Sequence, residues 1–187
     1  MSYSKKIEYR IVPDESFAVI RNCSGCGKKV HYVNTKRFRV NANGNKLDIW
    51  LIYQCENCKH TLNLTIYERQ KASSVPKEAY LKFLDNNETL AEEYGRNTAF
   101  FKKNKAEVDY GSYHFEKQRE TENAECQDGQ QLVVIKNPFE LKLRPERQLA
   151  DALSLSGSYV KKQIEMGSIK LEESSSQRGS AITDTIN

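Results

Sequence analysis

Two Cys-x-x-Cys pairs constrain the fold of this chain more than any other feature of its sequence. Cys23 and Cys26 form the first pair, and Cys55 and Cys58 form the second. Two thiolates at this spacing can grip one metal ion, and four make the tetrahedral set that zinc prefers. The segment between the pairs, residues 27–54, suits two strands and a turn that return the second pair to the first. We therefore expect a structural Zn²⁺ site, with no coordination position left for a substrate.

The same spacing leaves redox motifs and disulfides as alternatives to a metal site. Neither pair lies in the strand-to-helix context of a thioredoxin site, and disulfides are disfavoured in a reducing compartment. His60 follows the second pair and is either a substitute ligand or a surface histidine. Cys126, in the polar stretch NAECQDGQ, is expected to be a free surface thiol.

The composition is that of a mildly basic chain rather than a polycation. Of 187 residues, 29% are charged, and the net charge is +4. This balance permits nucleic-acid binding without requiring it. No apolar run approaches the roughly 20 residues that span a bilayer, and residues 1–12 lack the apolar core of a secretion signal. We expect a cytoplasmic protein with no membrane partner.

Strand and turn patterns surround the cysteine pairs. Alternation predicts strands over residues 7–12, 17–21, 36–40, 47–53 and 62–67. The segment Asn43-Gly44 is a strong hairpin signal between the third and fourth of these strands.

From Pro76 the pattern becomes helical. Pro76 suits a first helical position, Asn87 an N-cap, and Thr98 the start of a third short helix. The aromatic residues at helical spacing need a surface to pack on, so we expect the helices to cover one side of the sheet.

The last part of the chain predicts two short helices that run into a strand. Arg144-Pro145 opens the first helix, Ser156 or Ser158 opens the second, and Gly167 ends it. The strand begins at Ile169.

These patterns predict an α+β protein in three parts. The first, residues 1–110, is a zinc-ribbon-like antiparallel β domain with a helical cover. The second, residues 111–137, is a connection of strand and loop. The third, residues 138–187, is a small RNA-binding-like module of two helices and a strand with a polar tail.

Basic side chains at polar positions are the candidate nucleic-acid ligands, because phosphate contact needs mobile positive charges on one face. The candidates are Arg144, Arg147, Lys161, Lys162 and Lys170 in the last module, and Arg37 and Arg39 on the hairpin. An ordinary solvated face accounts equally for the hairpin pair.

The segment LRPERQLADALSLSGSYVKKQIEMGSIKL has opening arginines, a Leu-rich helix, a serine step and a basic helix that ends in Gly-x-Ile. It resembles the small RNA-binding fold named after ribosomal small-subunit protein four. The matching positions are Arg144, Arg147, Leu149, Leu153, Ser156, Lys161, Lys162, Ile164, Gly167 and Ile169. The resemblance implies a structured RNA partner, either rRNA or tRNA.

The motifs CSGCG, RFRVNANG, LDIWLIY and CENC, together with the C-terminal helix pair, carry a second resemblance. They are similar to a bacterial family known as a domain of unknown function (number 1062). That family implies no assigned activity.

Three classes of function follow from these features. We predict a non-catalytic, RNA-associated binding protein that contains zinc. The alternatives are a protein-interaction adaptor, whose edge strand or aromatic surface docks a partner, and an enzyme of unknown reaction. The sequence has no P-loop, nucleophile elbow, His-Glu-x-x-His or dinucleotide motif. Asp48 either anchors the turn at residues 41–45 or belongs to a site of acidic groups.

Overall fold

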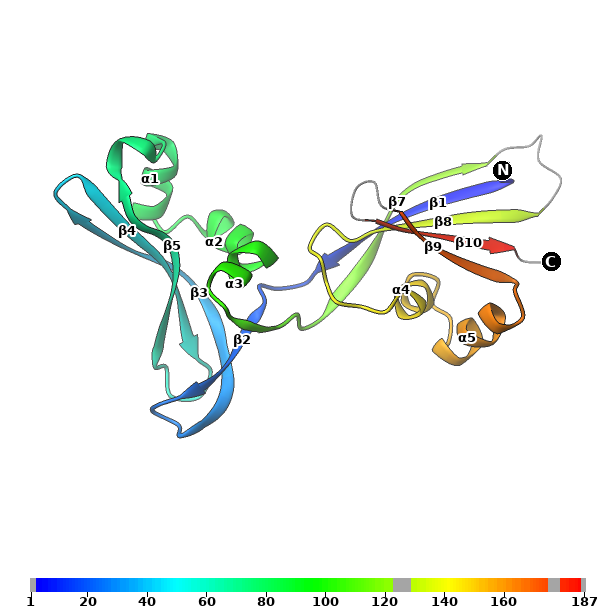
Figure 1. Ribbon diagram of the computed structural model, residues 1–187, viewed down its shortest axis with the longest axis horizontal. Helices are drawn as coiled ribbons and strands as arrows, with labels where there is room; N and C mark the ends of the chain where they lie inside the picture. The colour runs from blue at the N-terminus through cyan, green and yellow to red at the C-terminus, as the bar shows by residue number, and fades with distance from the viewer. Residues whose placement is uncertain (1–2, 123–128, 175–178, 186–187) are drawn as a thin grey trace. The chain divides into compact units, whose positions relative to one another are not determined.

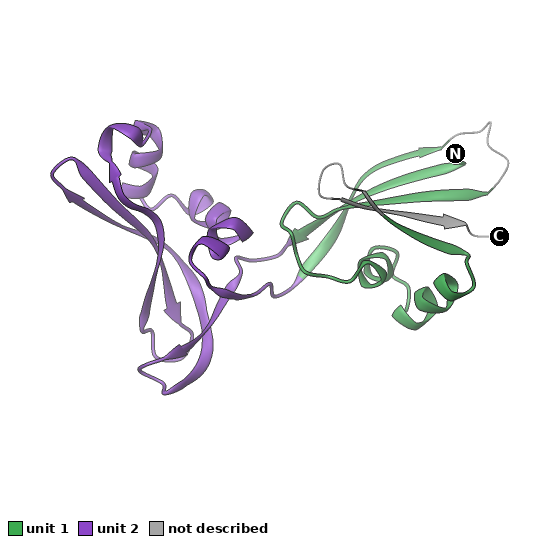
Figure 2. Ribbon diagram, in the orientation of Figure 1, with its two compact units in different colours: residues 1–12, 113–187 green, residues 13–112 purple. Residues whose placement is uncertain are grey.

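The chain forms two compact units. The computed structural model describes residues 3–122, 129–174 and 179–185 (Figure 1). Unit 1 contains residues 1–12 and 113–187, and unit 2 contains residues 13–112 (Figure 2). Unit 2 is therefore an insertion between the first and second segments of unit 1. Its two ends meet, because the backbone N–H of Asp14 donates to the carbonyl oxygen of Ser112 at 3.1 Å.

Unit 2 is built on a five-stranded sheet in the order β5-β4-β3-β2-β6. Its strands are β2 (Ala18–Cys23), β3 (Lys28–Asn43), β4 (Lys46–Cys55), β5 (Thr61–Lys71) and β6 (Glu107–Asp109). Adjacent strands pair antiparallel. The central hairpin of β3 and β4 turns at Gly44, which has the positive φ of 61° that glycine tolerates best. The predicted hairpin is confirmed.

Strand β3 is longer than the predicted strand at residues 36–40. A β-bulge interrupts the alternation of its side chains, so the pattern did not reveal the residues before the bulge. The register with β4 shifts between Asn34 and Arg37, and Lys36 has a φ of 59°. The side-chain oxygen of Asn34 accepts from the backbone N–H of Lys36 at 2.8 Å. Thr35 donates through its hydroxyl to the carbonyl oxygen of Ile52 at 2.7 Å. These bonds hold the extra residues in place and restore the alternation beyond them.

Three short helices cover one side of this sheet, as Figure 1 shows and as the sequence predicted. They are α1 (Lys77–Leu84), α2 (Glu88–Gly95) and α3 (Thr98–Lys103), preceded by the 3-10 turn η1 (Ala72–Ser74). Asn87 caps α2, as expected, by accepting from the N–H of Leu90. Asn97 rather than Thr98 caps α3, because an amide oxygen one residue earlier reaches the N–H of Phe100.

An aromatic cluster joins the helices to the sheet. Phe38 of β3 lies edge-on to Phe83 of α1, with ring centroids 5.0 Å apart. Tyr53 of β4 lies edge-on to Phe101 of α3 at 6.2 Å. Edge-to-face pairs contribute about 0.5–1.5 kcal/mol beyond the burial of their surface.

Helix α2 approaches the strands closely through Gly95. A Cβ at this position would lie 2.3 Å from the Ser16 hydroxyl oxygen and 2.7 Å from the Asn34 amide nitrogen. A glycine is therefore needed for this packing.

Unit 1 contains a second five-stranded sheet, in the order β7-β1-β8-β10-β9. Its strands are β1 (Lys5–Pro13), β7 (Tyr113–Glu122), β8 (Gln130–Lys136), β9 (Ile169–Ser174) and β10 (Gly179–Thr185). Strand β1 runs parallel to β8, whereas β10 runs antiparallel to both β8 and β9.

Two helices follow β8 in unit 1. They are α4 (Pro145–Ala152) and α5 (Gly157–Glu165), and α5 leads to β9. Leu149 of α4 and Val160 of α5 are fully buried, as is Ile135 of β8. Ser156 caps α5 by accepting from the N–H of Tyr159. The order of two helices and a strand is the one predicted.

The domain boundaries differ from the expected ones at residues 110 and 137. The first predicted strand pairs with β8 in unit 1 rather than joining the cysteine-bearing part. Residues 113–122 and 130–136, expected as a connection of strand and loop, are two strands of the unit 1 sheet. Part of the expected polar tail forms β10, between β8 and β9. These pairings are non-local, and the backbone hydrogen bonds that make them leave little trace in the side-chain pattern.

The protein is thus α+β, with two sheets that pair mainly antiparallel and several helices. In the described parts of both units, the helices are too short or too polar to cross a membrane.

Glu8 of β1 forms two ion pairs in unit 1, one with Lys6 of the same strand and one with Lys136 of β8. Glu8 accepts from Lys6 at 2.8 Å and from Lys136 at 2.9 Å. Hydrogen bonds from these two ammonium groups lower the pKa of Glu8 from 4.5 to about 2. A lowered pKa in the folded state stabilises the fold above the unfolded value, and that contribution is lost as the pH falls toward about 2.

We therefore expect Glu8→Gln to destabilise unit 1 by about 0.5–1 kcal/mol at pH 7. The difference between variant and wild type should shrink as the pH falls from about 4.5 toward 2. Urea unfolding at several pH values measures this difference. Glu172→Gln, an exposed change on β9, is the control. A Glu8→Gln deficit that is independent of pH would contradict the ion-pair explanation.

Candidate metal centre

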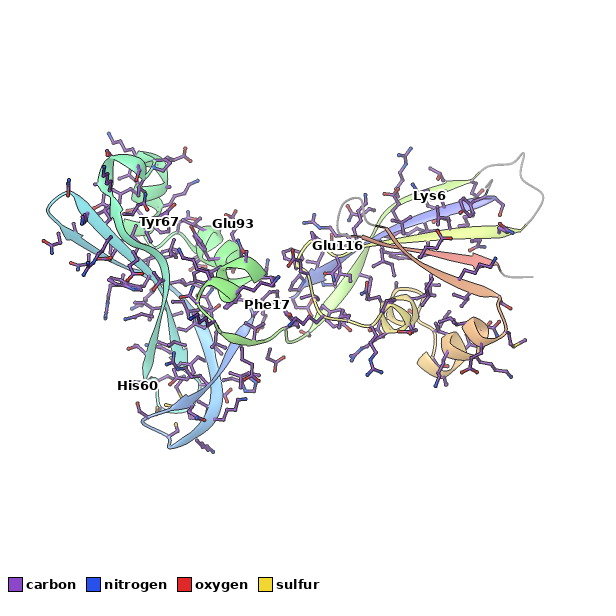
Figure 3. The ribbon with its side chains drawn as sticks, in the orientation of Figure 1. Lys6, Phe17, His60, Tyr67, Glu93 and Glu116 are labelled. Carbon is purple, nitrogen blue, oxygen red and sulfur yellow. The ribbon has the colours of Figure 1, made fainter. Side chains whose placement is uncertain are left out.

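The four paired cysteines meet at one end of unit 2. Cys23 ends β2 and Cys26 lies in the turn before β3, whereas Cys55 ends β4 and Cys58 lies in the turn before β5. The β3–β4 hairpin brings the second pair back to the first, as its length predicted. Figure 3 shows sulfur atoms near the labelled His60 at this end of the unit.

The sulfur geometry fits a tetrahedral ion. The Sγ atoms of Cys23 and Cys58 are 3.4 Å apart, and those of Cys26 and Cys55 are 3.6 Å apart. All four lie within 4.8 Å of one another. A tetrahedron with metal–sulfur bonds of about 2.3 Å has edges of about 3.8 Å. These four residues can therefore hold one metal ion.

Both cysteine turns have the same backbone form. Gly27 follows the first pair with a φ of 66°, and Lys59 follows the second pair with a φ of 64°. The N–H of Gly27 donates to the Cys23 carbonyl at 2.8 Å, and the N–H of Lys59 donates to the Cys55 carbonyl at 3.1 Å. The Cys58 N–H points at the Cys55 sulfur at 3.5 Å. Such N–H groups orient and stabilise thiolates that bind a metal.

The electrostatics of the cluster favour partial ionisation of the thiols. A hydrogen bond from the Tyr32 hydroxyl, helped by the N–H groups of Cys26 and Gly25, lowers the pKa of Cys23 to about 6. Its hydrogen bond with Cys58 and its burial raise the pKa of Cys26 to about 12. A group of thiolates this close needs a cation to neutralise it. The arrangement therefore favours metal binding coupled to proton release.

The cluster is shielded from solvent on one side. Cys23 and Cys55 are buried, Cys26 is half-buried, and Cys58 is exposed. Gly25 packs directly on the cluster, and a Cβ there would lie 2.9 Å from the Cys58 sulfur. A larger residue at this position must displace the Cys58 sulfur or shift the turn.

The alternative ligand lies at the edge of the cluster. The Nε2 atom of His60 is 3.3 Å from the Ser24 hydroxyl oxygen, and the sulfur atoms of the four cysteines form a complete set without it. Cys126 lies outside the described residues.

Asp48 does not anchor the hairpin turn. Its carboxylate accepts from the backbone N–H of Arg69 at 2.7 Å, where β5 has a φ of 46°. It stabilises an irregular point of β5 where the register with β4 shifts nearby.

The predicted nucleic-acid residues fall into two groups in different units. All of them are exposed: Arg144, Arg147, Lys161, Lys162 and Lys170 in unit 1, and Arg37 and Arg39 in unit 2. Arg144 is the N-cap residue of α4, and the Nε atom of Arg147 lies 3.5 Å from an Asp151 carboxylate oxygen.

Sequence reasoning missed a cavity of about 530 Å³ in unit 2. Its lining comes from the residues before β2, the β3 bulge, the end of α2, and the end of β6 with the segment that follows it. The polar and charged lining residues include Ser16, Asn34, Lys36, Arg96 and Asp109. Lys36 contacts Glu92 at 2.8 Å, and Asp109 contacts His31 at 3.1 Å. The bulge that shapes this cavity has no clear signal in the sequence.

The fold and the site define an α+β protein with a four-cysteine centre that can hold a metal ion. Comparison with known families gives a more specific result. A family described as a protein of unknown function (DUF1062) matches residues 40–175, and the chain belongs to this family. No curated protein and no solved structure matches the chain.

Gly25 provides a test of the sulfur geometry. We expect Gly25→Ala to weaken metal binding at least about tenfold, because the new methyl group must displace the Cys58 sulfur or shift the turn. Competition with a chromogenic chelator measures the affinity. Ser24→Ala in the same turn is the control, because the Ser24 hydroxyl contacts His60 rather than sulfur. Equal affinities for the two variants would contradict the close packing at residue 25.

Proposed function

We propose that this protein is a zinc-stabilised, non-catalytic binding protein that associates with RNA. The observation that carries the metal assignment is the set of four sulfur atoms within 4.8 Å of one another. Sulfur donors in a tetrahedral arrangement favour Zn²⁺ over harder ions such as Mg²⁺.

The role of the zinc is structural. Four thiolates fill a tetrahedral shell, so no position is left for a water or a substrate. The ion joins the start of β3 to the end of β4 and so closes a zinc-ribbon-like unit. Zinc sites of this type contribute on the order of 10 kcal/mol to the folding of small modules.

The purified protein should contain one Zn²⁺ per chain by elemental analysis. Cys58→Ser should lose most of this zinc, whereas His60→Ala should keep it, because the four sulfur atoms complete the shell. Chelation should lower the thermal stability of unit 2 by several kcal/mol. Retention of zinc by Cys58→Ser together with loss from His60→Ala would make the histidine the ligand instead.

The proposed RNA association depends on the helix pair of unit 1. Lys161 and Lys162 are exposed on α5, and Lys170 is exposed on β9. The exposed Tyr159 on the same helix adds an aromatic surface beside these cations. Arg144 and Arg147, at the start of α4, are exposed as well. Exposed cations on adjoining helices suit the phosphates of structured RNA, and the similarity of this segment to the ribosomal RNA-binding fold supports the assignment.

We expect the full chain to bind bulk tRNA or rRNA, with an affinity that falls as the salt concentration rises. Changing Lys161→Glu and Lys162→Glu together should weaken binding and lower the salt slope by about 0.9 for each lost phosphate contact. Fluorescence anisotropy of labelled RNA measures both effects. A matched double variant, Lys77→Glu with Lys105→Glu, makes the same charge change at exposed positions in unit 2.

If neither RNA binds at low ionic strength, the RNA assignment is wrong. If the two double variants weaken binding equally, the effect comes from net charge, and the α5 surface is not the binding face.

A further inference from the structure

The side of the unit 2 sheet that faces away from the helices presents a regular block of side chains. The β3–β4 register places Arg39 opposite Trp50 and Arg37 opposite Ile52. The β4–β5 register then places Thr65 opposite Trp50 and Asn63 opposite Ile52. Directly opposite residues in antiparallel strands share a face of the sheet. We call these six residues the Trp50 face.

Burial along β4 shows which side this face occupies. Leu47, Ile49, Leu51 and Tyr53 are buried, and the residues between them are half-buried. The rings of α1, α2 and α3 pack on the buried side, through Phe38 and Tyr53 among others. Trp50 therefore lies on the opposite side, and Figure 1 shows the three helices of residues 13–112 on one side of the sheet.

The Trp50 face is positively charged. Arg37 and Arg39 are exposed, and neither forms an ion pair within residues 13–112. The bulge sends the neighbouring Lys36 to the helix side, where it contacts Glu88 and Glu92. The next acidic residue along β4 on this face, Asp48, accepts a backbone N–H from β5. The two guanidinium groups thus have no acidic partner on the face.

We propose that the Trp50 face binds single-stranded RNA, with a base stacked on Trp50 and phosphates bound by Arg37 and Arg39. This inference rests on the proposed RNA association and assigns part of it to unit 2. Alternate residues of a strand lie about 6.8 Å apart, so the two arginines can contact successive phosphates of an extended strand. An aromatic ring with arginines beside it on a sheet is a common platform for unpaired bases. The amide of Asn63 and the hydroxyl of Thr65 can bond base edges.

The tryptophan content of the chain allows this proposal to be tested by fluorescence. Trp50 is the single tryptophan among the 187 residues, so intrinsic tryptophan fluorescence reports on this face alone. The full chain is titrated with a single-stranded oligouridylate of about 12 nucleotides, which spans one site of this kind. Anisotropy of the labelled RNA is followed in parallel, to measure total binding.

We expect RNA to quench the Trp50 fluorescence in a salt-sensitive way. Arg37→Glu with Arg39→Glu should remove the quenching, whereas Lys77→Glu with Lys105→Glu, on the helical side, should retain it. Trp50→Phe should bind within about threefold of wild type, and Trp50→Leu should bind about 5- to 150-fold more weakly. If the glutamate pair does not fold, Arg37→Gln with Arg39→Gln replaces it, and zinc content checks the fold of each variant.

The outcomes separate this inference from the proposed function. In one outcome the anisotropy shows RNA binding, but the Trp50 fluorescence is unchanged and the arginine variant binds with normal affinity. This outcome overturns the Trp50 face and leaves the α5 surface of unit 1 in place. Absence of binding to the oligouridylate overturns the Trp50 face alone, and absence of binding to tRNA and rRNA as well overturns both. Quenching by an RNA duplex but not by the single strand also overturns the proposal, because a paired base cannot stack on Trp50.

Discussion

The close approach of four sulfur atoms is the constraint on which the rest of unit 2 depends. Cys23 and Cys58 come from opposite ends of a segment that contains two strands and both cysteine turns, yet their sulfur atoms are 3.4 Å apart. Hydrophobic burial alone does not explain this arrangement, because Cys58 is exposed and the adjacent turns are polar. Four thiols at this distance do not all ionise readily, and the hydrogen bond with Cys58 together with burial raises the pKa of Cys26. A cation bound among the four sulfur atoms would stabilise the ionised thiolates, because each thiolate is attracted to it.

The two cysteine turns reach the same geometry at different conformational cost. Gly27 and Lys59 occupy equivalent positions and have nearly the same positive φ. Glycine adopts this conformation easily, whereas a residue with a Cβ does so at a cost of roughly 1 kcal/mol. The second turn therefore depends more on its sulfur ligands and on hydrogen bonds such as that from the Lys59 ammonium to the Glu56 carbonyl.

Local signals allowed much of unit 2 to be predicted from the sequence, but not the way the chain is divided. The cysteine spacing predicted the cluster, the Asn-Gly step predicted the hairpin, and the side chain of Asn87 predicted the start of α2. Each of these depends on residues close together in the sequence. The pairing of β1 with β8 joins Ile7 to Val133, and no pattern in either strand identifies its partner. The insertion of unit 2 follows from that pairing, so it could not be predicted either. The bulge at residues 34–37 was missed because Asn, Thr and Lys are common in strands. Only the hydrogen bonds of their side chains, which the sequence does not show, identify the bulge.

The cysteine cluster is also related to which side chains lie on each face of the sheet at Trp50. Cys55 and Trp50 belong to the same strand, five residues and about 17 Å apart, and they face opposite sides. A slip of one residue in the β3–β4 register would turn Trp50 toward the helices and Tyr53 toward solvent. The four cysteines come together at one end of the hairpin in this register, in which Cys55 pairs with Tyr32. The bulge then sets the alternation for the rest of β3, with Phe38 inward and both arginines outward. The position of the four cysteines is in this way tied to which side chains lie on each face of the sheet.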